Sequence, residues 1–427
     1  MDTFSFIHAS DLHLDAPFLG ISRELLHGER LAKQLRESTF LALDRLEKLC
    51  LDKKPQFLVL AGDLANSEEQ SIRARLRLHA LCQSLNRAKI RVFIIHGNHD
   101  PLDTSLKSVS WPENVTIFGS EAGEVVLYDG DSPYAVIHGI SHAKKGEKRN
   151  LSAFLHRNEE LNEVFQLGIL HCMVPGYVND GCAPSSLEDL LKTKLDAIAL
   201  GHVHKHAIIQ ENAPFIAYAG SPQGLHINED GEHGCYVVHV HKENDRYFCR
   251  PKFHPLCPIL WQSLEIDITS CETLEALFQE IEASLEIARL SLPPNVQSVI
   301  VRILLKGISP LERDLANNKN DLLHELSYLE TVKPSLWIRD LVLRTEPPLD
   351  RQSALKRDDL LGSVLRFAEA LRTKKEADGF IRQSLDPLYS HSQLSKILPA
   401  LSQDDLHELL IDAEKLCIQH LEDKRAY

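Results

Sequence analysis

Short apolar runs alternate with longer amphipathic stretches over the first 255 residues of the chain. This alternation is typical of layered α/β structure, in which buried strands are followed by helices that cover the sheet. The runs that we expect to form strands lie at residues 4–8, 57–61, 92–95, 134–138, 167–170, 197–200, 215–219 and 236–240. The pattern therefore predicts one α/β domain over residues 1–255.

The pattern changes beyond Cys257. We expect a strand, a helix, a strand, a helix and a strand in turn, at residues 261–268, 271–288, 296–305, 311–329 and 335–343. They would form a small α/β cap domain over residues 256–345, which Pro347 and Pro348 end. Residues 346–427 show no strand pattern and are expected to form a helical region, with one helix near 358–371.

Residues 402–427 have apolar positions at helical spacing. An apolar stripe on a helix has to pack against another surface. We expect this segment either to dock on a partner protein or to pack against the chain's own cap domain.

The composition is that of a globular protein without membrane segments. The 427 residues are 43% hydrophobic and 25% charged, and no apolar run approaches the roughly 20 residues of a membrane helix. Nine scattered cysteines without a C-x-x-C pair, and an acidic start in place of a basic signal peptide, predict a cytoplasmic protein. The net charge of −14 argues against general coating of DNA but leaves room for a local basic groove.

Polar residues gather where five of the expected strands end. The clusters are HASDLHLD, AGDLANS, HGNHD, HCMVPG and GHVHKH. Open α/β sheets bind their ligands at the carboxyl ends of strands. The side chains offered there are Asp11, His13, Asp63, Asn98, His99, His171, His202 and His204. We therefore expect these clusters to form one site.

Carboxylate, imidazole and amide ligands without a thiolate suit Mn, Fe or Zn. One carboxylate can bridge two such ions in a hydrolytic site. Cys172 follows His171 directly, and the alternation of side chains along a strand should turn it away from the site. A single cluster is weak evidence, because an isolated histidine is usually only hydrogen-bonded, but five in order strongly indicate a metal centre.

The series D-x-H, G-D, G-N-H-D, H and G-H-x-H resembles the signature of the calcineurin-like metallophosphoesterases over residues 1–240. The resemblance implies an α/β fold, a four-layer sandwich of two β-sheets flanked by helices. It also implies two divalent metal ions. Asp11, His13, Asp63 and His204 would hold one ion, and Asp63, Asn98, His171 and His202 the other. A hydroxide between the ions would attack phosphorus, and His99 would assist the leaving oxygen.

Within this family, HASDLHLD and the length of the chain resemble the DNA-repair exonuclease branch, the SbcD type. The stretch YAGSPQGLHINEDGEHGCYVV resembles the YhaO-like members. This resemblance implies Mn²⁺ as the metal and DNA as the substrate of an exonuclease or endonuclease. It also implies a homodimer and an SbcC-like coiled-coil ATPase as partner.

Two groups of basic residues could bind the DNA backbone near the metals. Arg73 and Arg77 lie one helical turn apart, and Lys144 and Lys145 begin a basic loop. The alternative is that both groups are ordinary solvated surface.

Asn66 stands where related enzymes commonly carry an acid or a histidine beside the catalytic histidine. It could accept a hydrogen bond from His99 without supplying a charge, or it could cap the helix that follows.

Three functions remain compatible with the sequence. The first is a DNA nuclease of repair, which needs an open, locally basic groove. The second is a phosphoesterase acting on a nucleotide or another small phosphodiester, which needs a closed pocket. The third is a subunit that mainly anchors a partner ATPase and depends on residues 402–427.

Overall fold

The computed structural model describes residues 3–18, 28–66, 71–103, 110–211, 213–329, 331–332, 335–348, 351–373, 377–390, 409–414, 416–417 and 421. The chain divides into two compact units. The first contains Met1–Glu265, Glu282–Leu304 and Asn320–Val342, and the second contains Ile266–Ile281, Leu305–Lys319 and Leu343–Tyr427.

The first sheet has the strand order β12-β11-β1-β2-β3-β4. Its strands are β1 (Thr3–Ala9), β2 (Phe57–Ala61), β3 (Arg91–Ile95), β4 (Val115–Ile117), β11 (Gly234–Glu243) and β12 (Arg246–Pro255). The strands β1 to β4 are parallel, so their carboxyl ends meet at one edge. β11 pairs antiparallel with β1 on its other side.

The second sheet has the order β5-β6-β7-β8-β10-β9. Its strands are β5 (Gly123–Asp129), β6 (Ser132–Gly139), β7 (Phe165–His171), β8 (Ala197–Gly201), β9 (Ala207–Gln210) and β10 (Phe215–Tyr218). The strands β6, β7, β8 and β10 are parallel, and this sheet also gathers its carboxyl ends at one edge.

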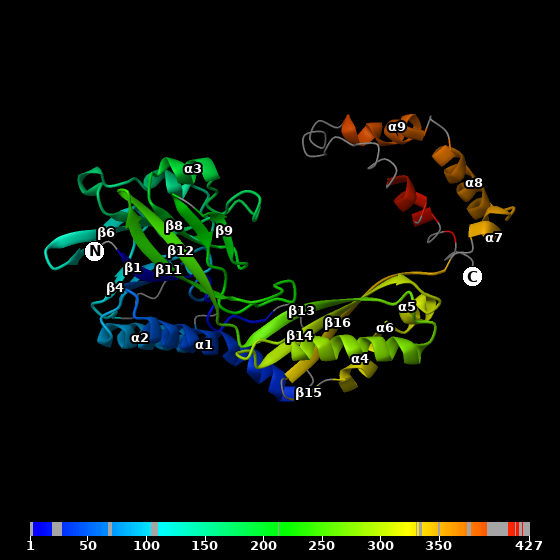
Figure 1. The fold of residues 1–427 in the computed structure, drawn as a ribbon, viewed down its shortest axis with the longest axis horizontal. Helices are drawn as coiled ribbons and strands as arrows, with labels where there is room; N and C mark the ends of the chain where they lie inside the picture. Colours follow the sequence, from blue (N-terminus) through cyan, green and yellow to red (C-terminus); the bar gives the residue numbers. More distant parts are fainter. Residues whose placement is uncertain are drawn as a thin grey trace. The chain divides into compact units, whose positions relative to one another are not determined.

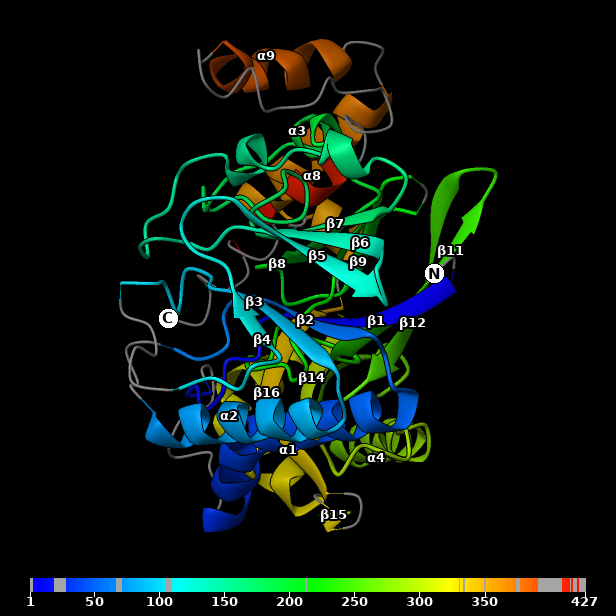
Figure 2. The same cartoon turned by 90° about the vertical axis from the view of Figure 1, so that its left-hand side faces the viewer.

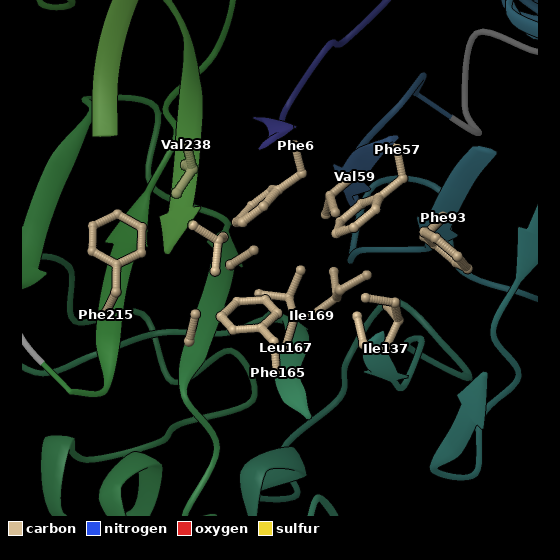
Figure 3. Close-up of a cluster of buried hydrophobic side chains, with 14 of the residues drawn as sticks. Phe6, Phe57, Val59, Phe93, Ile137, Phe165, Leu167, Ile169, Phe215 and Val238 are labelled. Carbon is tan, nitrogen blue, oxygen red and sulfur yellow. The ribbon is translucent and has the colours of Figure 1, made fainter. Parts of the chain in front are cut away.

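Each layer is held to the next by apolar side chains. Between the sheets lies an aromatic-rich cluster in which Phe6, Phe57 and Phe93 face Phe165 and Phe215 (Figure 3). A second cluster joins the first sheet to α1 (Gly28–Lys53) and α2 (Ile72–Arg87), and a third covers the second sheet beside α3 (Leu187–Lys192). Figure 2 shows α1 and α2 beyond one sheet and α3 beyond the other. The predicted four-layer sandwich is confirmed.

A third sheet follows in the sequence, with the order β13-β14-β16-β15 (Figure 1). Its strands are β13 (Ile259–Asp267), β14 (Ser298–Ile308), β15 (Thr331–Val332) and β16 (Ser335–Glu346), and α4 (Leu274–Leu290) lies between the first two in sequence. The prediction of a single helix over residues 311–329 was wrong. This range instead forms α5 (Glu312–Asn317), α6 (Lys319–Leu326) and a 3-10 turn, η3 (Ser327–Leu329).

The break between α5 and α6 falls at Asn318, whose backbone leaves the helical region at φ −119° and ψ 26°. Its side-chain amide donates to the carbonyl of Asp314. Asparagine side chains compete with the helix for backbone groups, which explains why the helix stops here.

The last described elements are the helices α7 (Arg351–Leu355), α8 (Leu360–Thr373) and α9 (Ala377–Tyr389). The helical region expected beyond residue 346 therefore includes α8 at the predicted place. Most of residues 402–427 lie outside the described part of the chain, so the docking prediction stays a prediction. Among the described residues, no helix is long and apolar enough to cross a membrane.

We predict that Phe165→Ala lowers the free energy of unfolding by about 3–5 kcal/mol, because it leaves a cavity between the two sheets. Phe165 is 0% exposed and contacts the rings of Phe4 and Tyr247 edge-on. Chemical denaturation followed by fluorescence measures the change. Ile72→Ala is the control, since Ile72 is 70% exposed and its truncation should change stability little.

Candidate metal centre

Three parallel strands deliver the first group of polar side chains. Asp11 and His13 follow β1, Asp63 follows β2, and Asn98 and His99 follow β3. Backbone hydrogen bonds tie the first two loops together, since the amides of Asp11 and His13 donate to the carbonyls of Gly62 and Asp63 at 3.0 Å. The loops are thus held side by side before any side chain is considered.

The Asp100 carboxylate joins the loop after β2 to the loop after β3. Its Oδ1 accepts from the amides of Gly97 (2.8 Å) and Asp63 (3.2 Å), and its Oδ2 accepts from the amide of Leu64 at 3.0 Å. Asp100 was not among the predicted site residues, although the motif G-N-H-D contains it. Its role is to hold Asp63 and Asn98 in register.

Several of the site residues have unusual backbone conformations. Asp11, His13 and Asp63 have φ angles of 52°, 42° and 52°, and His202 has a φ of 105°. Positive φ costs a non-glycine residue of order 1–3 kcal/mol and persists where the surroundings impose it, often at functional sites. Four such residues around one point indicate that the fold is built to aim these side chains.

Two glycines make the close packing possible. Gly62 has φ +89°, and a Cβ there would collide with the ring of His171. A Cβ on Gly97 would collide with the Asp63 carboxylate. Any side chain at either position would push Asp63, from the first sheet, and His171, from the second sheet, apart.

The second sheet supplies the histidines. His171 ends β7, and its Nε2 lies 3.3 Å from Asp63 Oδ2 and 2.9 Å from Asn98 Oδ1. His202 follows β8, and its Nδ1 lies 3.2 Å from the same Asn98 oxygen. The ligand set predicted for one ion, Asp63, Asn98, His171 and His202, is therefore brought together.

The other predicted set also meets. His13 Nε2 lies 3.1 Å from His204 Nε2 and 3.9 Å from Asp63 Oδ2. Ligand atoms of Asp11, His13 and His204 lie within 4.8 Å of one another, as do those of Asp11, Asp63 and His171. One oxygen of Asp63 thus faces both sets, which is the arrangement of a bridging carboxylate.

Each of the four histidines donates its outer N–H to the protein. The acceptors are Asn66 Oδ1 for His13, the Ala61 carbonyl for His171, Asp180 Oδ2 for His202 and Glu229 Oε1 for His204. We assign the tautomers from these partners. The inner nitrogen of each neutral ring then carries a lone pair, and it faces another lone pair at the centre of the site.

Lone pairs that face one another at about 3 Å in a buried site repel unless a cation lies between them. Outer N–H groups held by carboxylates, amides or carbonyls are the usual setting of metal-binding histidines. The residues therefore fit two divalent ions, one held by Asp11, His13, Asp63 and His204 and the other by Asp63, Asn98, His171 and His202. Their oxygen and imidazole donors do not identify the metal.

The electrostatics of the site agree with this fit. Burial alone would lower the pKa of His171, but Asp63 and Asp11 raise it to about 10. Burial would raise the pKa of Asp63, yet the neighbouring histidines hold it well below its usual range. Positive charge is therefore favoured at the centre of the site.

Comparison with known proteins decides the family. Residues 4–206 match the calcineurin-like phosphoesterase family, and residues 261–346 match the middle domain of metallophosphoesterase YhaO. The chain is 33% identical over 308 residues to the uncharacterized metallophosphoesterase YhaO of Bacillus subtilis (strain 168), a match that covers 72% of each chain. The chain belongs to the calcineurin-like metallophosphoesterases.

A more distant match is the DNA double-strand break repair protein Mre11 of Thermoplasma acidophilum. The identity is 28% over 187 residues, which cover 42% of this chain and 49% of the Mre11 protein. Among solved structures, a dimetal phosphatase from Danio rerio aligns with a TM-score of 0.34 and 11% identity, over 58% of this chain and 96% of that one.

His99 of this metallophosphoesterase lies beside the metal ligands. Its amide donates to Asp63 Oδ1 at 2.8 Å, and its ring centroid lies 5.1 Å from that of His13. Among the described residues its ring nitrogens form no hydrogen bond or ion pair with a metal ligand, whereas those of His171 and His202 lie 2.9 and 3.2 Å from Asn98 Oδ1. The ring is therefore placed next to the site rather than within the ligand sets.

Asn66 neither accepts a hydrogen bond from His99 nor caps the following helix, the two roles that the sequence suggested. Its Oδ1 accepts from His13 Nδ1 at 2.9 Å rather than from His99, and the N-cap of α2 is Ser71, whose side chain accepts from the amide of Ala74. The physical reason is the bridge between Leu14 and Ala65, which continues the pairing of the first two loops and sets Asn66 beside His13. Asn66 orients a metal ligand.

The basic residues have different surroundings. Arg73 pairs with Glu37, and Arg77 pairs with Asp44, so both charges are already matched on the surface. Lys144 and Lys145 are exposed. Cys172 is buried in the apolar cluster beneath the second sheet, as the alternation predicted, and burial raises the pKa of its thiol to about 12.

Three residues near the ligands had no signal in the sequence. Asp180 and Glu229 bind the outer nitrogens of His202 and His204, and the Cys182 thiol donates to Asn98 Oδ1 at 3.5 Å. All three lie in loops, and nothing in the local pattern links them to the strand ends.

We predict that Asn66→Ala lowers the affinity for Mn²⁺ by about 10-fold or more, because His13 loses the acceptor that fixes its orientation. His99→Ala should leave the affinity nearly unchanged, since its ring is not a ligand. Calorimetric titration of both variants with Mn²⁺ measures the difference. Equal losses in the two variants would contradict the assignment of Asn66.

Proposed function

We propose that this metallophosphoesterase hydrolyses phosphodiester bonds in DNA. The family membership makes it a metal-dependent phosphoesterase, and the observation that carries the proposal is the pair of ligand sets that share one oxygen of Asp63. The similarity to an Mre11 protein, which by its name acts in repair of DNA double-strand breaks, supports DNA as the substrate.

Two divalent ions, when bound, supply Lewis acidity for the phosphoryl oxygens and a deprotonated water at neutral pH. The chain's own residues hold the geometry. Asp63 faces both ligand sets through one oxygen and fixes the loop of His99 through the other, where it accepts the His99 amide. The same carboxylate therefore fixes both the position of the ligand sets, where the substrate phosphate would bind, and the position of His99.

His99 is the candidate proton donor. His99 is half-buried, and no hydrogen bond to its ring is found among the described residues. A protonated imidazole beside the metal ligands can give a proton to the leaving oxygen of a phosphodiester. The ring's position beside His13 supports this role.

The loop that carries Lys144 and Lys145 is connected to the site. The buried Glu147 in this loop accepts from the amide of Ala183 through its carbonyl, and the preceding Cys182 contacts the metal ligand Asn98. Glu147 also pairs with Arg149, which holds the loop in shape. Exposed lysines on a loop anchored beside the ligands are suited to contact a DNA backbone.

We further propose Mn²⁺ as the native metal and an SbcC-like coiled-coil ATPase as partner, bound through residues 402–427, with a homodimer as the assembly. The amphipathic pattern of that segment supports the docking site. Deleting residues 402–427 should spare metal-dependent hydrolysis and abolish copurification with the ATPase. An unfolded deletion variant would show instead that the segment packs on its own chain.

We predict that Asp63→Ala and His202→Ala abolish hydrolysis of duplex ends, single-stranded DNA and a small aryl phosphodiester in Mn²⁺. Asp63→Ala should also reduce the bound metal from two ions to less than one, because it removes the shared ligand, whereas His202→Ala should retain one ion. Metal analysis of the purified variants measures this. Hydrolysis of only the small ester by the wild type would favour the small-phosphodiester function over a nuclease.

We predict that the double change Lys144→Glu and Lys145→Glu raises KM for DNA at least about 10-fold and leaves hydrolysis of the small aryl ester unchanged, since backbone contacts contribute to DNA binding alone. The control is Lys48→Glu, an exposed lysine that pairs with Asp52 near the end of α1. Steady-state kinetics at fixed salt measures both. An unchanged KM for DNA would remove this loop from the substrate site.

A further inference from the structure

The segment from Gln223 to Gly231 connects the metal centre with the third sheet. It follows β10 and precedes β11, and all of its contacts named below lie within the first compact unit. We call residues 223–231 the linking segment. It contacts the metal ligand His204 on one side and the strands β13 and β14 on the other.

Glu229 makes the contact with the metal centre. Its Oε1 accepts from His204 Nδ1 at 3.0 Å, and its Oε2 accepts from the amide of Leu225, within the same segment, at 2.8 Å. Both carboxylate oxygens are therefore used. The orientation of the His204 ring depends on where the linking segment holds this carboxylate.

Strand β13 holds the linking segment by several hydrogen bonds, beginning with Gln223, which exchanges two with the backbone of Ile259. Trp261 donates from its ring nitrogen to the carbonyl of Gly224 at 2.8 Å and accepts from the amide of Gly231 at 3.1 Å. The amide of Ser263 donates to Asp230 Oδ2 at 3.3 Å. Trp261 is fully buried, so these bonds form in a packed environment.

Strand β14 adds a further contact through Arg302. Its guanidinium donates to Asn228 Oδ1 at 2.8 Å and to Asp340 of β16 at 2.7 Å. Asn228 and Glu229 are adjacent, so one residue is held by the third sheet and the next holds a metal ligand. A displacement of β14 would move Asn228, and with it the adjacent Glu229 and the orientation of the His204 ring.

We propose that Glu229 is a positioning residue through which the third sheet controls binding of the metal ion held by Asp11, His13 and His204. The proposal rests on the two-ion centre proposed above. The histidines of the other ion are not oriented by this segment, because His171 donates to the Ala61 carbonyl and His202 to Asp180, neither of which belongs to the linking segment. By linkage, binding of the first ion also restrains the third sheet.

A purely structural role for Glu229 makes different predictions. It would lower stability and affect both ions equally or neither. A positioning role affects one ion, acts only when His204 is present, and responds to changes in the third sheet that touch no metal ligand.

The test is calorimetric titration of the full-length protein with Mn²⁺, which resolves the two binding steps without an activity assay. Glu229→Gln should weaken one step by about 10- to 100-fold. Asp180→Asn, the matched change at the other ion, should weaken the other step. Glu229→Gln should have no further effect on Mn²⁺ affinity when His204 is already alanine, and its full effect when His202 is alanine.

Arg302→Ala tests the connection to the third sheet. It should weaken the same step as Glu229→Gln, at least about threefold, whereas Arg302→Lys should restore part of the affinity because it can still donate to Asn228. Arg289→Ala, which removes a partly exposed arginine paired with Glu286 on α4, should change neither step.

The outcomes separate the two proposals. If the wild type binds fewer than two Mn²⁺ ions, the two-ion centre fails. If it binds two, but Glu229→Gln weakens both steps alike or only lowers the melting temperature, the positioning role is overturned. If Glu229→Gln weakens one step and Arg302→Ala changes neither, Glu229 orients His204 but the control by the third sheet is overturned.

Discussion

The carboxylate of Asp100 accepts hydrogen bonds from three backbone amides that belong to two different loops. It holds the loop of Asp63 against the loop of Asn98, and these two residues are the ones that contact His171 of the second sheet. Charged acceptors make stronger hydrogen bonds than neutral ones, and here the charge is buried and fully used. The loops after β2 and β3 consequently behave as one body, to which the loop after β1 is added by backbone pairing with Gly62, Asp63 and Leu64.

The second sheet completes the centre because the two sheets bring their carboxyl ends together. His171 reaches Asp63 across the boundary between the sheets, and the glycines at 62 and 97 leave it room. The aromatic cluster that includes Phe57 and Phe165 sets the separation of the sheets. Packing in the core and distances among the ligands are therefore parts of the same constraint, and a residue far from the metals can alter them.

Much of this arrangement could be predicted from the sequence. The strands that end in polar clusters are apolar and almost entirely buried, so their place followed from their pattern, and the polar clusters at their ends indicated that Asp11, Asp63 and His171 meet. The strands β4, β5, β9 and β12 were not expected, because they are short or half-exposed and lack a continuous apolar run.

The contacts of Asn66, Asp180 and Glu229 could not be predicted either. They depend on loop conformations that bring together residues of different segments, and a hydrogen-bond acceptor of a histidine has no periodic signal. The same holds for the break at Asn318, where a local side-chain bond outweighs a helical pattern that continues on both sides.

The place of β1 in the first sheet has a consequence for how the protein is made. Of the described strands, β1 is synthesised first, yet it lies between β2 and β11, and β11 begins at Gly234. A nascent chain that has not reached this point carries β1 with one side unpaired, and such open edges are sites of aggregation during synthesis. His202 and His204 emerge shortly before β11. The closing of the sheet and the delivery of the last ligands thus fall within the same short interval of translation, and a product truncated before it can neither complete its first sheet nor acquire both ions.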